Sequence, residues 1–575
     1  MIEMTLATKF IPGTNLSGNL ACADWRYLLP SLELDKILCI GAPTARVLGV
    51  LSTVGKTIHI AAKEENRLKT IKHECEERGL KNIQIHPVKT YSDLPFSANS
   101  IDLLFLTKKS NNEVYLSEKE ILKELKKLLK AKGVIYFETS SLKARSSAQS
   151  SIKALARDGI SVKGSYWLTP FTGHLRTAVP AGNKTISAYF FKNVMFGQSF
   201  KKRTLSRVGG MLSKTGLISP VVPRHAVMLH KTNGNGTASD NQFVDVPEYI
   251  SKMAEKAGLD LSKYTFGLNA RGKYNANKVI FFLFGKKSRQ IEIVLKVTRA
   301  PEFNYRLENE FHVLSKLSEG GFVGKETYPG PLFFDYHNKL AVLAIEAVHG
   351  NPFRTRTQAT ANCPVAHSAI QWLLKLGKTS ANPDAVTPKD VAKALKQLFE
   401  TFTDIYKSPK EEVEFLRRQI DTIGNSKIAF PAVFQHGDPG TWNMMVDKGD
   451  NIIVIDWEAG EPQGMPLWDI FYFFRTYASW VARQQGSRDA LKNFSTHFLG
   501  KTDINELIGN TISTYCENTG LARELIKPLF FTCWMHRSLK EACRLTESEL
   551  KNGHFVNVLR LCMREQNSEA LKSLF

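Results

Sequence analysis

The sequence lacks any run of 18 apolar residues, so it predicts no membrane-spanning helix. Its longest apolar stretches, such as residues 279–284, have the length of buried strands. Residues 1–10 lack a basic segment followed by an apolar one, which argues against a secretory signal. We therefore expect a cytoplasmic protein, either free or peripheral at the inner face of the membrane.

The eight cysteines form no pair or cluster. The sequence has no C-x-x-C motif and no group of histidines near a cysteine, which excludes the common zinc motifs. We expect reduced, mostly buried thiols of a cytosolic protein. The positions are Cys22, Cys39, Cys75, Cys363, Cys516, Cys533, Cys543 and Cys562.

Acidic residues are absent from one long segment. Residues 159–239 carry 11 Lys and Arg and no Asp or Glu, which is half of the net charge of +22. Such a block implies an anionic partner. Three interpretations stay open: a solvated linker, attachment to an anionic membrane surface or lipid-linked glycan, and binding of single-stranded nucleic acid. Nucleic acid is the least favoured, because no recognition module accompanies the aromatic residues of this segment.

Strands alternate with helices over residues 30–195. Apolar runs at 100–107 and 133–140 flank a charged helical pattern, and further strands are predicted at 160–170 and 184–193. This alternation predicts a parallel sheet with helices on both faces. The expected fold is an α/β, doubly wound, Rossmann-like domain that we place at residues 1–197.

The order of these elements resembles a class I S-adenosylmethionine methyltransferase. The stretches "LPFSANSIDLLFL" and "LKELKKLLKAKGVIYFE" carry most of the likeness. The family's cofactor positions are altered here. The loop after the first strand keeps one glycine, Gly41, and contains Pro43, whereas Ala61 and Thr90 stand where acidic residues are expected. We therefore expect a degenerate domain that does not bind S-adenosylmethionine.

Residues 198–241 are rich in Gly, Ser, Pro and Asn, and they are interpreted as a basic linker. The first part of this segment fits a short basic amphipathic helix. One side of that helix would carry Leu205, Val208, Met211 and Leu212.

The pattern changes at residue 242. Strands are predicted at 278–284, 290–297 and 340–348, with a helix between the second and the third, and residues 355–575 are largely helical in pattern. We expect an α+β bilobal domain over 242–575, with a first lobe at about 242–350 and a second at about 351–575.

Five polar residues of this domain follow one another in the order of a kinase-like phosphotransferase. They are Lys296, Glu310, Asp438, Asn443 and Asp456. With "FQHGDPGTWNMMV" and "IDWEAGEPQGMPLWDIFYFF", the domain resembles the aminoglycoside phosphotransferase and choline kinase family.

The resemblance implies a role for each residue. Asp438 would accept or orient the proton of the substrate hydroxyl. Asn443 and Asp456 would supply oxygen ligands for Mg²⁺. Lys296 would hold the phosphates of ATP, and Glu310 would fix that lysine by an ion pair.

The resemblance also assigns supporting positions. Glu346 and Val348 fit the connection between lobes that meets adenine, and Gly272 fits the nucleotide loop. His436 and Asp469 are expected to orient the catalytic loop.

The predicted function is an ATP- and Mg²⁺-dependent phosphotransferase acting on a hydroxyl of a small molecule, sugar, glycan or lipid-linked saccharide, with a non-catalytic methyltransferase-like domain. Two alternatives remain. One is a bifunctional methyltransferase–kinase of surface glycan synthesis, and the other is a non-enzymatic scaffold that uses both folds for binding.

Overall fold

The chain divides into two compact structural units. The computed structural model describes residues 20–91, 94–107, 119–141, 145–146, 148, 152, 159–170, 173–195, 200–215, 222–232, 243–272 and 274–575. The sheet unit comprises Ser17–Asn304 and Leu332–Ala344, and the helical unit comprises Tyr305–Pro331 and Ile345–Phe575. This division differs from the predicted boundaries, because most of the predicted first lobe lies in the sheet unit.

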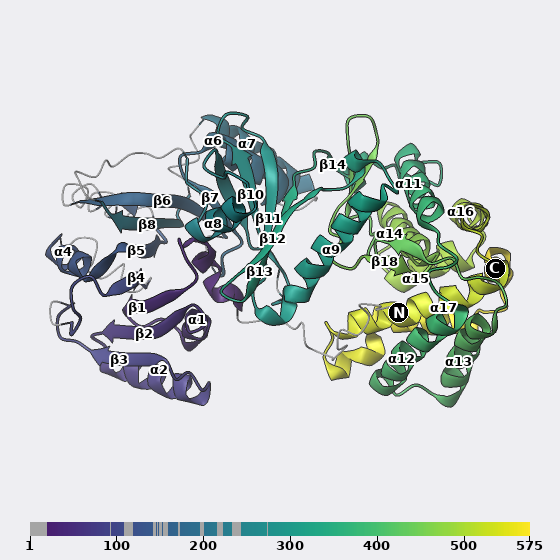
Figure 1. The fold of residues 1–575 in the computed structure, drawn as a ribbon, viewed down its shortest axis with the longest axis horizontal. Helices are drawn as coiled ribbons and strands as arrows, with labels where there is room; N and C mark the ends of the chain where they lie inside the picture. The colour runs from purple at the N-terminus through teal and green to yellow at the C-terminus, as the bar shows by residue number, and fades with distance from the viewer. Residues whose placement is uncertain are drawn as a thin grey trace. The chain divides into compact units, whose positions relative to one another are not determined.

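Five parallel strands open the sheet unit, in the order β3-β2-β1-β4-β5. Along β1, Ile37 and Cys39 pack into one core, whereas Leu38 and Ile40 pack into another on the opposite face. Helices α1 and α2 join the first core and α4 joins the second, so both faces are covered. The predicted doubly wound sheet is confirmed (Figure 1). These elements are β1 (Leu34–Ile40), α1 (Ala45–Leu51), β2 (Gly55–Ala62), α2 (Glu65–Glu77), β3 (Ile83–Pro87), β4 (Ile101–Leu106), α4 (Lys119–Leu128) and β5 (Leu129–Thr139).

Antiparallel strands extend this sheet to 13 strands, in the order β5-β8-β6-β7-β9-β10-β11-β13-β12. Pairing of β7 with β9, through Thr177 with Asn269 and Ala178 with Leu268, joins the strands predicted for the phosphotransferase-like domain to those of the methyltransferase-like domain. The added strands are β6 (Ile160–Thr169), β7 (Thr177–Pro180), β8 (His225–Lys231), β9 (Tyr264–Asn269), β10 (Val279–Gly285), β11 (Ile291–Val297), β12 (Pro331–His337) and β13 (Leu340–Glu346).

Two predictions for this unit are wrong. Residues 225–231, taken as part of the linker, form the inner strand β8, because the apolar run from Ala226 to Leu229 is buried between β5 and β6. Residues 184–193, taken as a strand, form α6 (Lys184–Tyr189) and a π-helical turn (Phe190–Val194). Asn183 starts α6, since its side chain accepts a hydrogen bond from the Ile186 N–H at 3.0 Å.

The predicted basic amphipathic helix is present as α7 (Phe200–Thr215), but its buried side differs from the expected one. The residues turned inward are small: Ser206, Gly209 and Ser213. A Cβ at Gly209 would lie 2.4 Å from the Phe191 ring, which shows how closely α7 approaches its neighbour. Val208 and Met211 are consequently exposed, at 51% and 70%, while the side chain of Leu205 lies outside the described residues.

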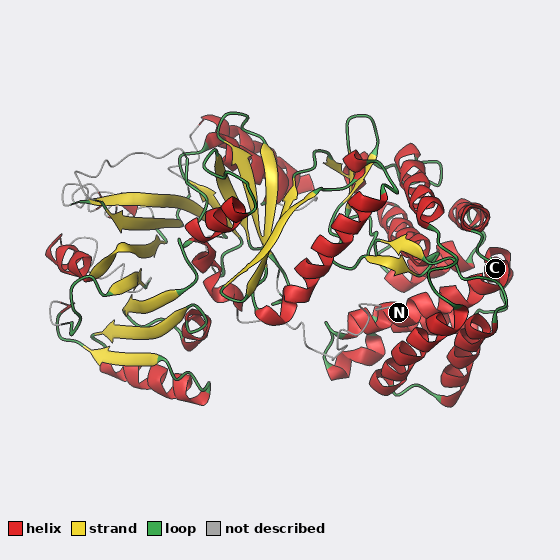
Figure 2. Cartoon of the chain, in the orientation of Figure 1, coloured by secondary structure: helices red, strands yellow, loops and turns green. Residues whose placement is uncertain are grey.

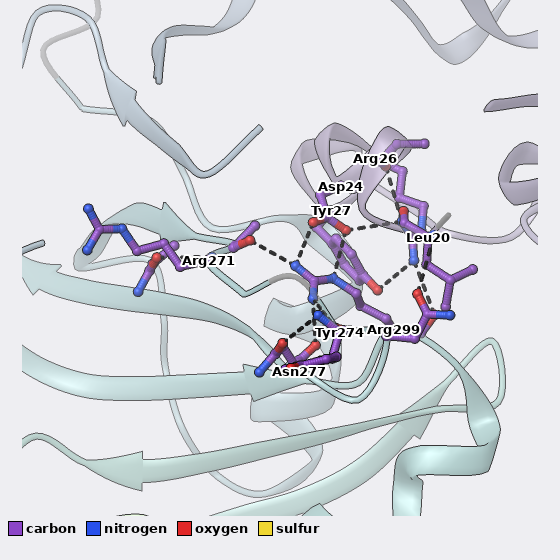
Figure 3. A network of polar contacts seen from close by, with 12 residues as sticks. Leu20, Asp24, Arg26, Tyr27, Arg271, Tyr274, Asn277 and Arg299 are labelled. Carbon is purple, nitrogen blue, oxygen red and sulfur yellow. Dashed lines mark hydrogen bonds and ion pairs between the residues drawn. The ribbon is translucent and has the colours of Figure 1, made fainter. Parts of the chain in front are cut away.

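A buried ion pair ties the start of the described chain to the end of β11 (Figure 3). Asp24, in the 3-10 helix Leu20–Leu28, accepts two hydrogen bonds from Arg299 at 3.1 and 2.8 Å, and both side chains are fully buried. The remaining Arg299 donors reach the carbonyls of Ala270, Tyr274 and Asn277 at 2.8–3.1 Å. Arg299 thereby fixes the β9–β10 loop, which contains Gly272.

The helical unit consists mainly of helices, as predicted for residues 355–575 (Figure 2). Its strands are β14 (Asn351–Pro352), β15 (Val433–Gln435), β16 (Met444–Val446), β17 (Ile452–Val454) and β18 (Glu461–Gly464). Its helices are α9 (Asn304–Gly320, which begins at the boundary), α10 (Phe353–Arg356), α11 (Pro364–Ser380), α12 (Pro388–Tyr406), α13 (Lys410–Asn425), α14 (Trp468–Gln484), α15 (Ala490–Phe494), α16 (Asp503–Thr519), α17 (Ile526–Ala542), α18 (His554–Arg564) and α19 (Glu569–Leu574).

All eight cysteines are free thiols, and six of them are buried, as predicted. Within the described ranges, no helix is both long and apolar enough to cross a membrane.

Asp24→Asn tests the buried ion pair. Removing one charge leaves Arg299 buried without its partner, so we expect the free energy of unfolding to fall by about 3 kcal/mol. Urea unfolding followed by circular dichroism measures the loss. Asp35→Asn is the matched control, because Asp35 is 54% exposed and pairs with Lys56 and Lys130 at the surface, so its loss should cost less than about 1 kcal/mol. Equal losses in the two variants would contradict the role given to Asp24.

Candidate active site

The loop between β15 and β16 is held by one carboxylate. Asp469, in the first turn of α14, accepts hydrogen bonds from the N–H groups of His436 at 2.6 Å and Gly437 at 3.0 Å. Burial raises the pKa of Asp469, and the neighbouring His436 and these two backbone donors oppose that rise. The predicted supporting role of Asp469 is confirmed.

His436 is also structural, as predicted. Its Nδ1 accepts a hydrogen bond from the Asp438 N–H at 3.2 Å, which leaves Nε2 as the donor to the Ile455 carbonyl at 3.1 Å. The ring is fully buried, so it joins the loop to the segment that precedes Asp456 without being open to a substrate.

Gly437 is required between these two residues. Its φ is +76°, a backbone conformation that favours glycine, and a Cβ would lie 1.9 Å from the Ala459 carbonyl oxygen. A side chain at this position would push the loop away from the turn that follows Asp456.

Asp438 is the partly exposed carboxylate at the centre of the loop, with a side chain that is 33% exposed. Its Oδ1 lies 3.3 Å from Arg537 Nη1, and its Oδ2 accepts a hydrogen bond from Asn443 Nδ2 at 3.2 Å. The same Asn443 nitrogen donates to the Asp438 carbonyl at 2.9 Å. The structure therefore brings Asp438 and Asn443 together, with the carboxylate held from both sides.

Asp456 lies two residues after β17 and is half-buried. The Ile455 N–H donates to the Asn443 carbonyl at 2.9 Å, which places Asn443 and Asp456 on adjacent segments. Asp456 has a φ of +69°, which is uncommon for a residue with a side chain. Strained backbone of this kind is concentrated at functional sites.

Helix α9 contacts the turn that follows Asp456. Glu310 is fully buried, and its Oε1 accepts a hydrogen bond from the Trp457 N–H at 3.2 Å. Asn309 Nδ2 donates to the carbonyls of Glu458 at 3.1 Å and Gly460 at 2.9 Å. Glu310 is thus placed to couple α9 to the Asp456 segment, a contact that the sequence did not predict.

The remaining predicted positions lie on other elements. Lys296 lies in β11 of the sheet unit and is buried. Its ion pair with Glu310 of the helical unit stays a prediction. Gly272 has a φ of +116°, and a Cβ there would lie 2.3 Å from the Asn277 side chain, so this position requires glycine. Glu346 is exposed at the end of β13, and Val348 is half-buried just beyond it.

Sequence reasoning missed Arg537 and Tyr472. Arg537, on α17, is buried, donates to the Gly437 carbonyl at 2.7 Å and lies 3.4 Å from the centre of the Tyr472 ring. Burial lowers the pKa of Arg537, but Tyr472 and Asp438 outweigh it and leave that pKa raised. A signal was available: Arg537 follows the apolar run "FFTCWM", and a charge on such a helix needs a buried partner.

The predicted cofactor loop of the methyltransferase-like domain is contacted by an arginine of α2. Arg67 Nη2 donates to the Ala42 carbonyl at 2.7 Å, and the side chains of Ala42 and Ala61 are buried. Gly41 has a φ of +85°, a conformation that favours glycine, in the turn that follows β1. Thr90 is exposed, whereas Asp93 lies outside the described residues.

Comparison with known families finds a match to the second predicted domain. The model of the phosphotransferase enzyme family matches residues 275–494, which include Asp438, Asn443 and Asp456. The predicted resemblance to a phosphotransferase family is confirmed for residues 275–494. A search of curated proteins finds no match to the chain.

Solved structures are similar to either part of the chain or to both. Aminoglycoside phosphotransferase APH(3'')-Id from Streptomyces rimosus is 14% identical, with 52% of this chain and 98% of that chain covered and a TM-score of 0.30. A SAM-dependent methyltransferase from Aquifex aeolicus is 18% identical, with 23% and 76% covered and a TM-score of 0.21. WbdD, solved with the kinase inhibitor LY294002, is 12% identical, with 88% and 87% covered and a TM-score of 0.24.

Proposed function

We propose that this chain is an ATP- and Mg²⁺-dependent phosphotransferase that acts on a hydroxyl of a sugar, glycan, lipid-linked saccharide or other small molecule. The observation that carries the proposal is the Asp438 carboxylate. It lies on a loop that Asp469 fixes through two backbone hydrogen bonds, it is open to solvent on one side, and Asn443 contacts it directly. A phosphotransferase-family domain around it supports the same chemistry.

The reaction joins the acceptor oxygen to the γ-phosphorus of ATP and breaks the bond from that phosphorus to the bridging oxygen, which leaves with ADP. Asp438 orients the acceptor hydroxyl and takes its proton. Arg537 and Asn443 hold the two carboxylate oxygens, so little reorientation of Asp438 is needed during the step.

The residues present fit a magnesium ion. Asn443 uses its amide nitrogen on Asp438, so its amide oxygen is the end left for a metal, and Asp456 adds a carboxylate from the adjacent segment. Mg²⁺, when bound, neutralises charge on the phosphate oxygens. The hydrogen bonds from α9 to the turn after Asp456 keep that carboxylate in place.

The nucleotide positions belong to the same proposal. Lys296 would hold the phosphates, with Glu310 as its ion-pair partner, and the β9–β10 loop at Gly272 would cover them. Glu346 and Val348 would meet adenine. Arg299 supports the loop assignment, because it donates to three of its carbonyls and so makes it rigid.

The methyltransferase-like sheet is proposed to be non-catalytic. Two features support this: Arg67 donates to the Ala42 carbonyl in the predicted cofactor loop, and Ala61 stands where an acidic residue would hold the ribose.

We also propose that α7 attaches to an anionic membrane surface. Val208 and Met211 are exposed on the same helix as the exposed Arg207 and Lys214, inside a block without acidic residues. Exposed apolar side chains together with basic ones are the features that favour binding to anionic lipid.

Asp438→Asn tests the proposed reaction. The amide cannot take a proton, so kcat should fall by at least about 100-fold. ADP release is measured with MgATP and a panel of sugars and polyols. Asp404→Asn is the control, because Asp404 is 79% exposed on α12. If Asp438→Asn retains turnover within about threefold of wild type, a catalytic role for this carboxylate is wrong.

Titration calorimetry tests the first domain. We expect no heat of binding for S-adenosylmethionine, with a dissociation constant weaker than about 1 mM. MgATP injected into the same sample shows that the chain is competent to bind a ligand. A micromolar dissociation constant for S-adenosylmethionine would refute the non-catalytic assignment.

Sedimentation with vesicles tests α7. Wild type should sediment with vesicles that contain phosphatidylserine and not with pure phosphatidylcholine, and high salt should release it. Replacing Val208 and Met211 by Glu should weaken binding by about tenfold or more, since it removes apolar contacts and adds repulsion. Ile428→Glu, at a position that is 48% exposed in the helical unit, is the control. Equal binding of all three proteins would exclude α7 as the attachment site.

A further inference from the structure

Three arginines line a small cavity beside the catalytic loop. Arg354 comes from α10, Arg475 and Arg483 come from α14, and the cavity measures about 60 Å³. Among residues 305–331 and 345–575, no carboxylate oxygen lies within 4.0 Å of any of the three guanidinium groups. Like charges brought together without acids repel each other, so this arrangement is unfavourable until an anion joins it.

The contacts that these arginines do make are with neutral groups. Arg354 Nε donates to Thr441 Oγ1 at 2.9 Å, and its guanidinium lies 5.5 Å from the Trp442 ring centre. Arg475 Nε donates to His554 Nε2 at 3.3 Å. Burial, followed by the charge of Arg475, lowers the pKa of His554 to about 4, so that ring is neutral.

Burial lowers the pKa of Arg475, and the charge of Glu541 opposes this effect. Glu541 Oε2 accepts a hydrogen bond from the Phe555 N–H at 2.8 Å. Burial lowers the pKa of Arg354, with Arg483 and Arg475 adding to the effect. Both arginines therefore keep donors for which the described part of this unit supplies no acceptor of opposite charge.

A hydroxyl in the cavity wall gives an independent sign of a missing ligand. Ser479 is 8% exposed, and its Oγ is buried without a hydrogen-bond partner among the described residues. Buried polar atoms nearly always have a partner, so an unsatisfied one in a cavity wall marks a place for a ligand or water. Trp442, which also lines the cavity, is 45% exposed and has a flat apolar face.

The cavity is connected to Asp438 through a short series of contacts. Trp442 lies edge-on to Tyr472, with ring centres 6.2 Å apart. The Arg537 guanidinium lies over the Tyr472 ring and forms an ion pair with Asp438. The Thr441 N–H donates to Thr476 Oγ1 at 3.2 Å, which fixes the catalytic loop to α14 beside the cavity.

We infer that the phosphate acceptor carries a fixed anionic group, a phosphate or a carboxylate, which Arg354, Arg475 and Arg483 bind while Trp442 contacts the saccharide ring. The inference rests on the proposed function, because it assigns the cavity to the second substrate of that reaction. Arginine is suited to the task, since its planar donors match phosphate and carboxylate. A polycationic acceptor is disfavoured at this cavity for the same reason.

The first experiment compares acceptors that differ in charge. Phosphoryl transfer to glucose is measured against glucose 6-phosphate and glucuronate, with kanamycin as the cationic comparison. We expect kcat/KM to be at least about tenfold higher for an anionic member, the size of effect given by charge-assisted hydrogen bonds. The two anionic sugars distinguish phosphate from carboxylate.

The second experiment measures binding without turnover. Calorimetry follows glucose 6-phosphate binding while adenylyl imidodiphosphate and Mg²⁺ fill the nucleotide site. Arg354→Met and Arg483→Met should each weaken binding by about tenfold, and Arg483 is exposed, so its variant is expected to fold. Arg418→Met, an exposed change on α13 that alters net charge equally, should weaken it less than about twofold.

Several outcomes would overturn the inference. They are no binding of either glucose 6-phosphate or glucuronate to the filled wild type, equal weakening by Arg418→Met, and an Arg354→Met effect on the KM of ATP alone. Faster transfer to neutral or cationic acceptors would also overturn it, but would support the proposed function. Anion binding by a chain that turns over no ATP would instead refute the proposed function.

Discussion

The Asp469 carboxylate is the constraint on which the rest of the site depends. It accepts hydrogen bonds from the N–H groups of His436 and Gly437, and these bonds fix the turn that leads to Asp438. A buried carboxylate that accepts two backbone donors cannot be replaced by an apolar group without leaving those donors unsatisfied. The left-handed Gly437 and the buried His436 then carry this rigidity to Asp438 and to the segment of Asp456.

The sequence was most informative where chemistry needs a fixed residue type at a fixed spacing. The loop residues Asp438 and Asn443 are five apart, and one amide nitrogen links them, so their contact follows from local geometry. Asp469 was predicted from the segment "PLWDI", and it lies in the first turn of the apolar helix α14. The family model agrees with this part of the chain.

The sequence was least informative where long-range packing decides. Arg537 lies 99 residues from Asp438, and only the folded helices bring it there. The strand β8 was hidden because basic and glycine-rich flanks surround its four apolar residues, and its pairing partners are distant in sequence. At α7, small residues allowed a close approach that turned Val208 and Met211 outward, against the expectation that apolar residues are buried.

The extended sheet gives the methyltransferase-like half a structural use. Pairing of β7 with β9 and the burial of Asp24 against Arg299 join the first segment of the described chain to the β9–β10 loop. All the Arg299 donors bind Asp24 or one of three carbonyls around that loop. The conformation of the loop therefore depends on Asp24, which belongs to the methyltransferase-like half. The proposed loss of cofactor binding would therefore leave this domain with a structural role.

Within the helical unit, Asp438 is held by two partners that lead to different places. Asn443 connects it, through Ile455, to Asp456 and to the residues of α9 that hold the following turn. Arg537 connects it, through Tyr472, to Trp442 and the arginine-lined cavity. The proposed metal and the proposed acceptor thus depend on separate side chains around one carboxylate. Substitutions on α10 and α14 can therefore change acceptor charge preference without altering the hydrogen bonds on the metal side.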